Sequence, residues 1–152
     1  MTALVFVDSN VFIVDRFYPR DALYSQNRSF IEKLPSLDAA VSILSLLEVC
    51  GAASHRLSAG ELDSWLFRFD TIYPVHVINV HGLSQKEAEA WWYGFVREVT
   101  VAIAKKMSFG DALLLREAEN YHVEAIVTWN TKDFFRRTRI DVLTPTAFLR
   151  QH

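Results

Sequence analysis

The chain has 152 residues, of which 51% are hydrophobic, and it carries 16 Lys and Arg against 18 Asp and Glu, a formal net charge of −2. This composition excludes a disordered chain, and the single cysteine, Cys50, excludes a scaffold held together by intrachain disulfides. The near-neutral charge argues against a protein that binds nucleic acid through a broad basic surface, although residues 131–152 hold five basic residues against two acidic ones.

The first residues carry no targeting signal that we can identify. The apolar run of residues 3–7 is too short for a signal peptide, lacks a basic start and ends at Asp8. No uncharged apolar stretch approaches the roughly 18 residues of a membrane span. We therefore expect a cytoplasmic protein with no membrane partner.

Apolar patterning in the first half of the chain predicts buried strands that alternate with helices. The strands are expected at residues 4–7, 39–44 and 75–80. Three helices are expected, at residues 25–34, 45–57 and from Ser58 through Phe69.

The second half continues the same alternation. Ser84 and Glu87 have the spacing of a capping box and predict a long helix to about Lys106, although the β-branched residues 99–103 are also compatible with a strand. Further elements follow in the order helix 111–121, strand 125–128, strand 140–143 and a short helix from Pro145. Such alternation predicts one α/β domain over residues 1–152, with a mostly parallel sheet of four or five strands covered on both faces.

Four acidic residues stand at the beginnings of helices or the ends of strands: Asp8, Glu48, Asp111 and Asp133. The carboxyl ends of parallel strands form the crevice in which ligands bind, so these side chains are expected at one edge of the sheet. Carboxylates that gather there repel one another unless a cation joins them. Oxygen ligands without a convergent His or Cys favour a hard ion such as Mg²⁺ or Mn²⁺.

A structural interpretation of three of these acids competes with the metal site. Ser45-x-x-Glu48, Ser108-x-x-Asp111 and Asn130-x-x-Asp133 all have the form of helix N-terminal capping signals. An acid in the first turn also interacts favourably with the helix dipole. The two interpretations are compatible, because helix N-termini help to hold negative charge.

Four short motifs together resemble the PIN-domain nucleases. They are Val7-Asp8-Ser9-Asn10-Val11-Phe12, Ser45-Leu46-Leu47-Glu48-Val49, Gly110-Asp111-Ala112-Leu113-Leu114 and Ile126-Val127-Thr128-Trp129-Asn130-Thr131-Lys132-Asp133-Phe134. They occur in the order of that family, and the resemblance extends from residue 4 to about residue 149.

The resemblance implies a PIN-like three-layer α/β/α fold and an endoribonuclease that depends on Mg²⁺ or Mn²⁺. Small members of the family are mostly VapC-type toxins, which implies a homodimer and a protein antitoxin as partners. By position, Asp8, Glu48, Asp111 and Asp133 would be the catalytic and metal-binding acids. Ser9, Thr128 and Asn130 would support them through hydrogen bonds.

Four further residues are candidates for contact with RNA: Trp129, Lys132, Arg136 and Arg137. Trp129 falls where many relatives carry Arg; it can stack on a base or belong to the core. The basic residues can hold the phosphate backbone or simply face solvent.

Two other functions are compatible with the sequence. The fold could serve as a non-catalytic binding module that uses its tryptophan-rich long helix, or Asp8 could be the nucleophile of a phosphatase or phospho-acceptor domain. Asp8-Ser9-Asn10 lacks the second Asp that a haloacid-dehalogenase-type phosphatase requires.

Overall fold

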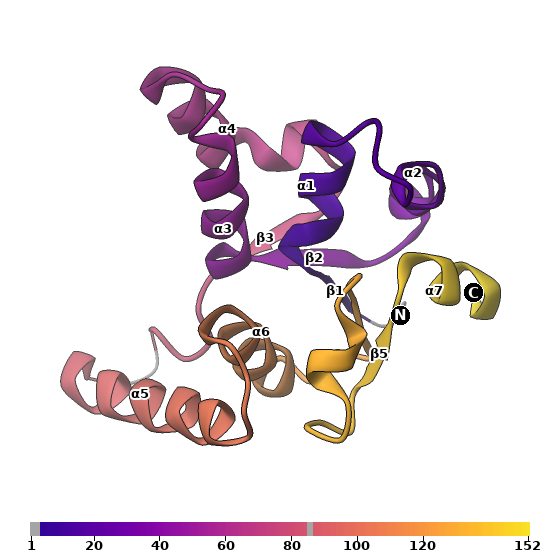
Figure 1. The fold of residues 1–152 in the computed structure, drawn as a ribbon. Coiled ribbons are helices and arrows are strands. Elements are labelled where there is room, and N and C mark those ends of the chain that lie inside the picture. The colour runs from indigo at the N-terminus through magenta and orange to yellow at the C-terminus, as the bar shows by residue number, and fades with distance from the viewer. Residues whose placement is uncertain (1–3, 85–86) are drawn as a thin grey trace.

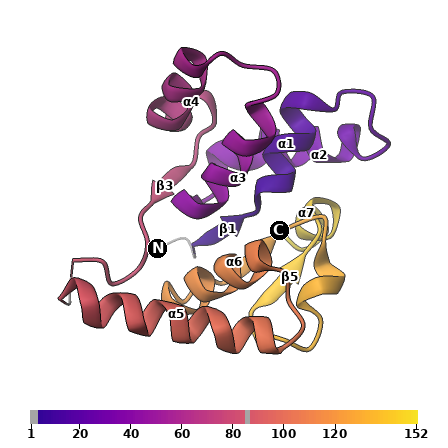
Figure 2. The same cartoon turned by 60° about the vertical axis from the view of Figure 1, so that its left-hand side comes forward.

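A five-stranded sheet forms the centre of the computed structural model, which describes residues 4–84 and 87–152 (Figures 1 and 2). All neighbouring strands run parallel in the order β3-β2-β1-β4-β5. The strands are β1 (Val5–Val7), β2 (Ala39–Ser42), β3 (His76–Ile78), β4 (Ala125–Val127) and β5 (Asp141–Leu143). The parallel sheet predicted from the sequence is therefore confirmed, with five strands.

Helices cover both faces of this sheet, as Figure 1 shows. One face carries α1 (Ser9–Phe17), α2 (Tyr24–Lys33), α3 (Ile43–Ala53) and α4 (Ala59–Ile72), with α7 (Pro145–Gln151) beside α2. The other face carries α5 (Ala88–Ala104) and α6 (Phe109–Asn120). Two 3₁₀ helices complete the chain, η1 (Leu34–Ser36) and η2 (Thr131–Phe134). No helix within residues 4–84 or 87–152 is long and apolar enough to cross a membrane.

Two hydrophobic cores lie on the two faces because side chains alternate along each strand. In β1, Val5 and Val7 face the core beneath α1 to α4, whereas Phe6 faces the core beneath α5 and α6. The same division separates Ala125 and Val127 from Ile126 in β4. Continuous apolar runs, rather than alternating ones, are what such doubly covered strands require.

Helix α1 was not among the elements expected from the sequence. It begins directly after β1 because the Asp8 side chain accepts a hydrogen bond from the backbone N–H of Ser9 and occupies the N-cap position. An acid that serves as a cap immediately after a strand leaves no loop residues between strand and helix. From the sequence, Asp8 therefore indicates the end of a strand but not the start of a helix.

The capping signals proposed for α3 and α5 were wrong. The Ser42 hydroxyl, not that of Ser45, caps α3 by accepting from the Leu44 N–H at 3.2 Å, so the helix starts earlier and Glu48 lies in its second turn. Helix α5 starts at Ala88 with Glu87 at the N-cap and without a side-chain capping bond.

The alternative of a strand at residues 99–103 is also wrong, because these residues continue α5. Val99 and Ala102 of this segment are buried against α6, and a β-branched run is tolerated in a helix when one side packs in this way.

A buried ion-pair network fixes α5 against α6. The Arg116 guanidinium donates to Glu98 of α5 at 2.8 Å and to the fully buried Glu117 beside it. The remaining Glu117 oxygen accepts from the backbone N–H of His81 at 2.9 Å, and the His81 carbonyl accepts from the Trp91 indole at 3.1 Å. This network holds in place the helix that carries Asp111.

We expect Phe12→Ala to lower the free energy of unfolding by about 3–5 kcal/mol. Phe12 is fully buried, and its ring centroid lies 5.0 Å from those of Phe69 and Tyr73. Urea denaturation followed by circular dichroism would measure the loss. Phe67→Ala is the matched control: Phe67 is 74% exposed, so its change should stay within about 0.5 kcal/mol. Equal losses in both variants would contradict the assignment of Phe12 to the core.

Candidate active site

The four acids predicted from the sequence come from four separate elements. Asp8 follows β1, Glu48 lies in the second turn of α3, Asp111 in the first turn of α6, and Asp133 in η2 after β4. Because β1, β2 and β4 are parallel neighbours, their carboxyl ends lie at one edge of the sheet. Helix α6 brings the fourth acid there through its N-terminus.

Asp8 is the most enclosed of the four, with an exposed fraction of 5%. Its Oδ1 accepts from the Ser9 backbone N–H at 2.7 Å, and its Oδ2 accepts from the Thr128 hydroxyl at 2.7 Å. The Ser9 hydroxyl lies 2.7 Å from Glu48 Oε2 and donates to it. Ser9 therefore links Asp8 to Glu48 of α3.

Asn10 is a site residue to which sequence reasoning gave no role. Its amide nitrogen donates to Thr128 Oγ1 at 3.0 Å and lies 3.3 Å from Asp8 Oδ2, while its amide oxygen accepts from the Trp129 N–H at 3.2 Å. Thr128 Oγ1 in turn accepts from the Asn130 N–H at 3.0 Å. The signal was present, because Asn10 directly follows Asp8-Ser9 in the first motif.

Asp111 and Asp133 are each held by a neighbouring polar side chain. Ser108 caps α6 by accepting from the Asp111 N–H at 3.2 Å, and its hydroxyl lies 2.9 Å from Asp111 Oδ2. The Asn130 amide donates to Asp133 Oδ2. The capping interpretation is thus confirmed for Ser108. It was wrong for Asn130, which stands at the N-cap of η2 without a side-chain capping bond and instead directs its amide to the Asp133 carboxylate.

Gly110 allows α3 and α6 to approach each other at the site. A β-carbon at this position would overlap the Glu48 carboxylate, whose Cδ would lie only 3.3 Å away. A larger residue would have to push Glu48 aside. The glycine therefore brings the Glu48 carboxylate against the first turn of α6, where Asp111 lies.

Electrostatics connect the acids in pairs. The pKa of Asp8 is raised to about 6, mainly by burial and also by the negative charges of Glu48 and Asp111, while the hydrogen bonds from Thr128 and the Ser9 N–H oppose the rise. Burial also raises the pKa of Asp111, with a contribution from Asp133 and an opposing one from Ser108 and Arg137.

The side chains of the four acids supply oxygen donors, the kind of ligand that a hard divalent cation takes. None of the four acids forms an ion pair with Lys, Arg or His among the described residues. Within this same part of the chain, no three His, Cys, Asp or Glu side chains form a group that could hold a metal ion. Mg²⁺ commonly binds through one or two carboxylates plus water and phosphate rather than in an all-protein cage. Asp8 and Glu48, which the Ser9 side chain and backbone link through hydrogen bonds, are two carboxylates that could hold such an ion.

The four residues predicted to contact RNA differ in accessibility. The Trp129 indole donates to Asn27 Oδ1 at 2.7 Å and packs against the core, so its ring is not free to stack on a base. Arg137 is half-buried and donates to backbone carbonyls, including that of Asp133 at 2.8 Å. Lys132 and Arg136 are exposed, and the Arg136 guanidinium lies above the Phe135 ring.

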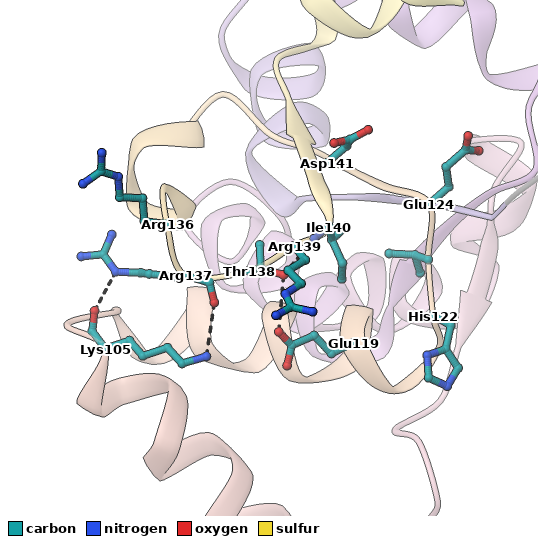
Figure 3. A pocket seen from close by; sticks show the side chains of 11 residues that line it. Lys105, Glu119, His122, Glu124, Arg136, Arg137, Thr138, Arg139, Ile140 and Asp141 are labelled. Carbon is teal, nitrogen blue, oxygen red and sulfur yellow. Dashed lines mark hydrogen bonds between the residues drawn. The ribbon is translucent and has the colours of Figure 1, made fainter.

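A cavity of about 780 Å³ is lined by none of the four acids. It extends along the segment that links η2 to β5 and reaches the C-terminal part of α6, as Figure 3 shows. Its charged lining includes Lys105, Arg136, Arg137 and Arg139, together with Glu119, Glu124 and Asp141.

Solved structures provide the comparisons that find a match. No family model matches the chain, and no curated protein matches it either. The chain is similar to a structure of VapBC2 from Rickettsia felis bound to a DNA fragment from their promoter, with 18% identity, a TM-score of 0.60, and coverage of 91% of this chain and 96% of the other. It is also similar to a toxin–antitoxin complex from Klebsiella pneumoniae, with 22% identity, a TM-score of 0.58, and coverage of 93% of this chain and 97% of the other. A structure of FitAcB from Neisseria gonorrhoeae has 16% identity and a TM-score of 0.57, and the match covers 93% of this chain and 97% of the other. This likeness establishes a shared fold and confirms the PIN-like architecture.

We expect the Asp8 carboxyl to titrate near pH 6 in the metal-free protein. This pKa lies above that of the unfolded chain, so the protonated form favours the fold. The free energy of unfolding should therefore fall by about 3 kcal/mol, through this group, as the pH rises from about 4 to about 6. Carbon-13 NMR of the side-chain carboxyl would give the midpoint.

Two variants separate the causes of this shift. Thr128→Val removes a donor to the charged form and should raise the Asp8 midpoint, whereas Glu48→Gln removes a neighbouring charge and should lower it. A wild-type midpoint near 4, or a shift in the same direction in both variants, would contradict the geometry described for Asp8.

Proposed function

We propose that the protein is a metal-dependent endoribonuclease that hydrolyses RNA phosphodiester bonds. The observation that supports this function is the gathering of Asp8, Glu48, Asp111 and Asp133 at one edge of the sheet. Within residues 4–84 and 87–152 their hydrogen-bond partners are neutral donors and none has a cationic partner. Repulsion between the acids is relieved when a cation binds, which makes the edge receptive to Mg²⁺ or Mn²⁺ with its phosphate ligands.

The proposed chemistry is attack of water on the phosphodiester. A bound divalent ion would polarise the phosphoryl oxygen and lower the pKa of a water molecule. Asp8 and Glu48 would hold the ion, and their orientation is fixed by Ser9 and Thr128. Asp111 and Asp133 would complete the acidic edge from the opposite side.

We further propose that the protein acts as the toxin of a type II toxin–antitoxin pair. The structures with the same fold include a toxin–antitoxin complex from Klebsiella pneumoniae and VapBC2 from Rickettsia felis. By analogy, a cognate antitoxin and a second copy of this chain are the proposed protein partners. The four motifs of the sequence support this assignment alongside the fold.

Asp8→Asn should preserve the fold and reduce RNA cleavage in Mg²⁺ or Mn²⁺ by at least about 100-fold, since it removes a metal-binding charge. Cleavage of a labelled RNA, with circular dichroism as the folding check, would measure this. The products should carry 5′-phosphate and 3′-hydroxyl ends because water, not the ribose 2′-hydroxyl, attacks. Asp63→Asn, at an exposed position of α4, is the control. Unchanged cleavage by Asp8→Asn protein free of contaminating nuclease would reject the proposal.

Metal binding should also be visible without activity. Mn²⁺ at about 100 times its dissociation constant should stabilise the wild type by roughly 2.7 kcal/mol, because the ion binds only the folded chain. Thermal unfolding with and without EDTA would detect this, and Glu48→Gln should abolish the stabilisation. If Mn²⁺ changes neither unfolding nor RNA cleavage, the non-catalytic binding module is the better interpretation.

A further inference from the structure

A single arginine joins two segments of the proposed active site. Arg137 Nε donates to the Lys105 carbonyl at 2.6 Å, and Arg137 Nη1 donates to the Asp133 carbonyl at 2.8 Å. The carbonyls of Lys106 and Lys132 also accept from this guanidinium, each at 3.5 Å. We call this guanidinium, together with the four carbonyls that surround it, the Arg137 clamp.

The clamp lies between the C-terminal ends of two helices. Lys105 is the C-cap of α5, and η2 ends at Phe134. The last carbonyls of a helix have no partner within the helix and carry partial negative charge, so a cationic donor is favourable there. A planar guanidinium with five N–H donors can serve both helix ends at once, whereas a lysine ammonium is a point charge on a flexible stem.

No other side chain joins these two segments by hydrogen bonds. Residues 105–111 and 131–137 are all described by the structure, and every hydrogen bond between the two ranges involves Arg137. Its own carbonyl accepts from Lys105 Nζ at 3.2 Å, as Figure 3 shows. Arg136 and Lys106, on opposite sides of the clamp, have φ angles of 59° and 66°. Left-handed backbone is unfavourable for such residues and persists where surrounding contacts hold it.

Both segments lead directly to acids of the proposed active site. The turn after α5 continues through the buried Met107 to Ser108, which caps α6 and bonds to Asp111. On the other side, Asp133 itself supplies a carbonyl to the clamp. Among the described residues, no ion pair joins Arg137 to either carboxylate. The guanidinium therefore reaches both acids through the backbone.

We propose that Arg137 is a positioning residue that sets the placement of Asp111 relative to Asp133. This inference rests on the proposed nuclease function and adds a residue to it. Arg137 would act through backbone carbonyls and would contact neither RNA nor metal. A displacement of about 1 Å in a catalytic arrangement can lower the rate roughly 100-fold, so a side chain that fixes two acids from outside the site is consequential.

Amide NMR of the metal-free protein tests the positioning without catalysis. Arg137→Lys keeps the positive charge but loses the planar fork, so it should still shift the amide signals of Asp111 and Asp133 and leave that of Asp8 in place. Arg137→Gln should shift the same two signals. Arg139→Gln, at an exposed position two residues further on, is the matched control and should leave the Asp111 signal unchanged. An unchanged Asp111 signal in both Arg137 variants would overturn the inference.

Cleavage kinetics separate positioning from other roles. Both Arg137 variants should lower kcat by about 10- to 100-fold and leave KM for RNA unchanged, because geometry and not binding is lost. A raised KM with unchanged kcat would instead make Arg137 an RNA-binding residue. Full activity of Arg137→Lys would show that only charge matters, and a lower melting temperature with wild-type kcat would show a purely structural role. Each of these three results would overturn the inference.

A measurement on the wild type covers the case in which the variants do not fold. The Arg137 Nε–H is bonded to the Lys105 carbonyl, so it should exchange with solvent more slowly than the Nε–H of the exposed Arg139. Equal exchange rates would overturn the inference. If the wild type cleaves no RNA with Mg²⁺ or Mn²⁺, the proposed function fails. Slow exchange at Arg137 and a shifted Asp111 amide in Arg137→Lys would still support the clamp as the link between the two acids.

Discussion

A buried carboxylate at the end of the central strand constrains the geometry of this edge of the sheet. An anion removed from water is tolerated only when donors surround it, and Asp8 finds them on its own helix and on the next strand. Thr128, directly after the neighbouring strand β4, supplies the second donor, so the bond depends on the register that pairs Phe6 with Ile126 and Val7 with Val127. A slip of one residue would turn Thr128 toward the opposite face and leave the carboxylate without that donor.

Helix capping and the gathering of acids reinforce each other. Ser108 both starts α6 and holds the carboxylate of Asp111, and Asp8 itself starts α1. The helix N-termini contribute partial positive charge where negative charge is concentrated. The acids are therefore held near one another by neutral groups and backbone dipoles. Among the described residues, no cationic side chain pairs with them.

Much of this arrangement could be predicted from the sequence because it depends on local patterns. Apolar runs gave the five strands, and parallel topology placed Asp8, Glu48 and Asp133 at one edge. Helix α1 was missed because its cap is also a strand end, and the start of α3 was displaced because Ser42 and Ser45 are both plausible caps. Local patterns do not distinguish such alternatives.

Tertiary contacts decided the rest. The Trp129 indole donates to Asn27 rather than facing solvent, and Arg137 donates to the carbonyl of Lys105, 32 residues away in the sequence. The Asn10 side chain of α1 donates to Thr128, which is 118 residues away in the sequence. Partners at such separations leave no periodic signal in the chain.

The distance along the chain between Asp8 and Thr128 also has a consequence during synthesis. Their hydrogen bond spans 120 residues, and β4 must pair with β1 before it can form. A nascent chain emerges from its N-terminus, so Asp8 acquires this hydrogen bond only after residues 125–128 have been made. Contacts of this range form late and slowly compared with helices. The acidic edge is therefore complete only after β4 has been made and has paired with β1.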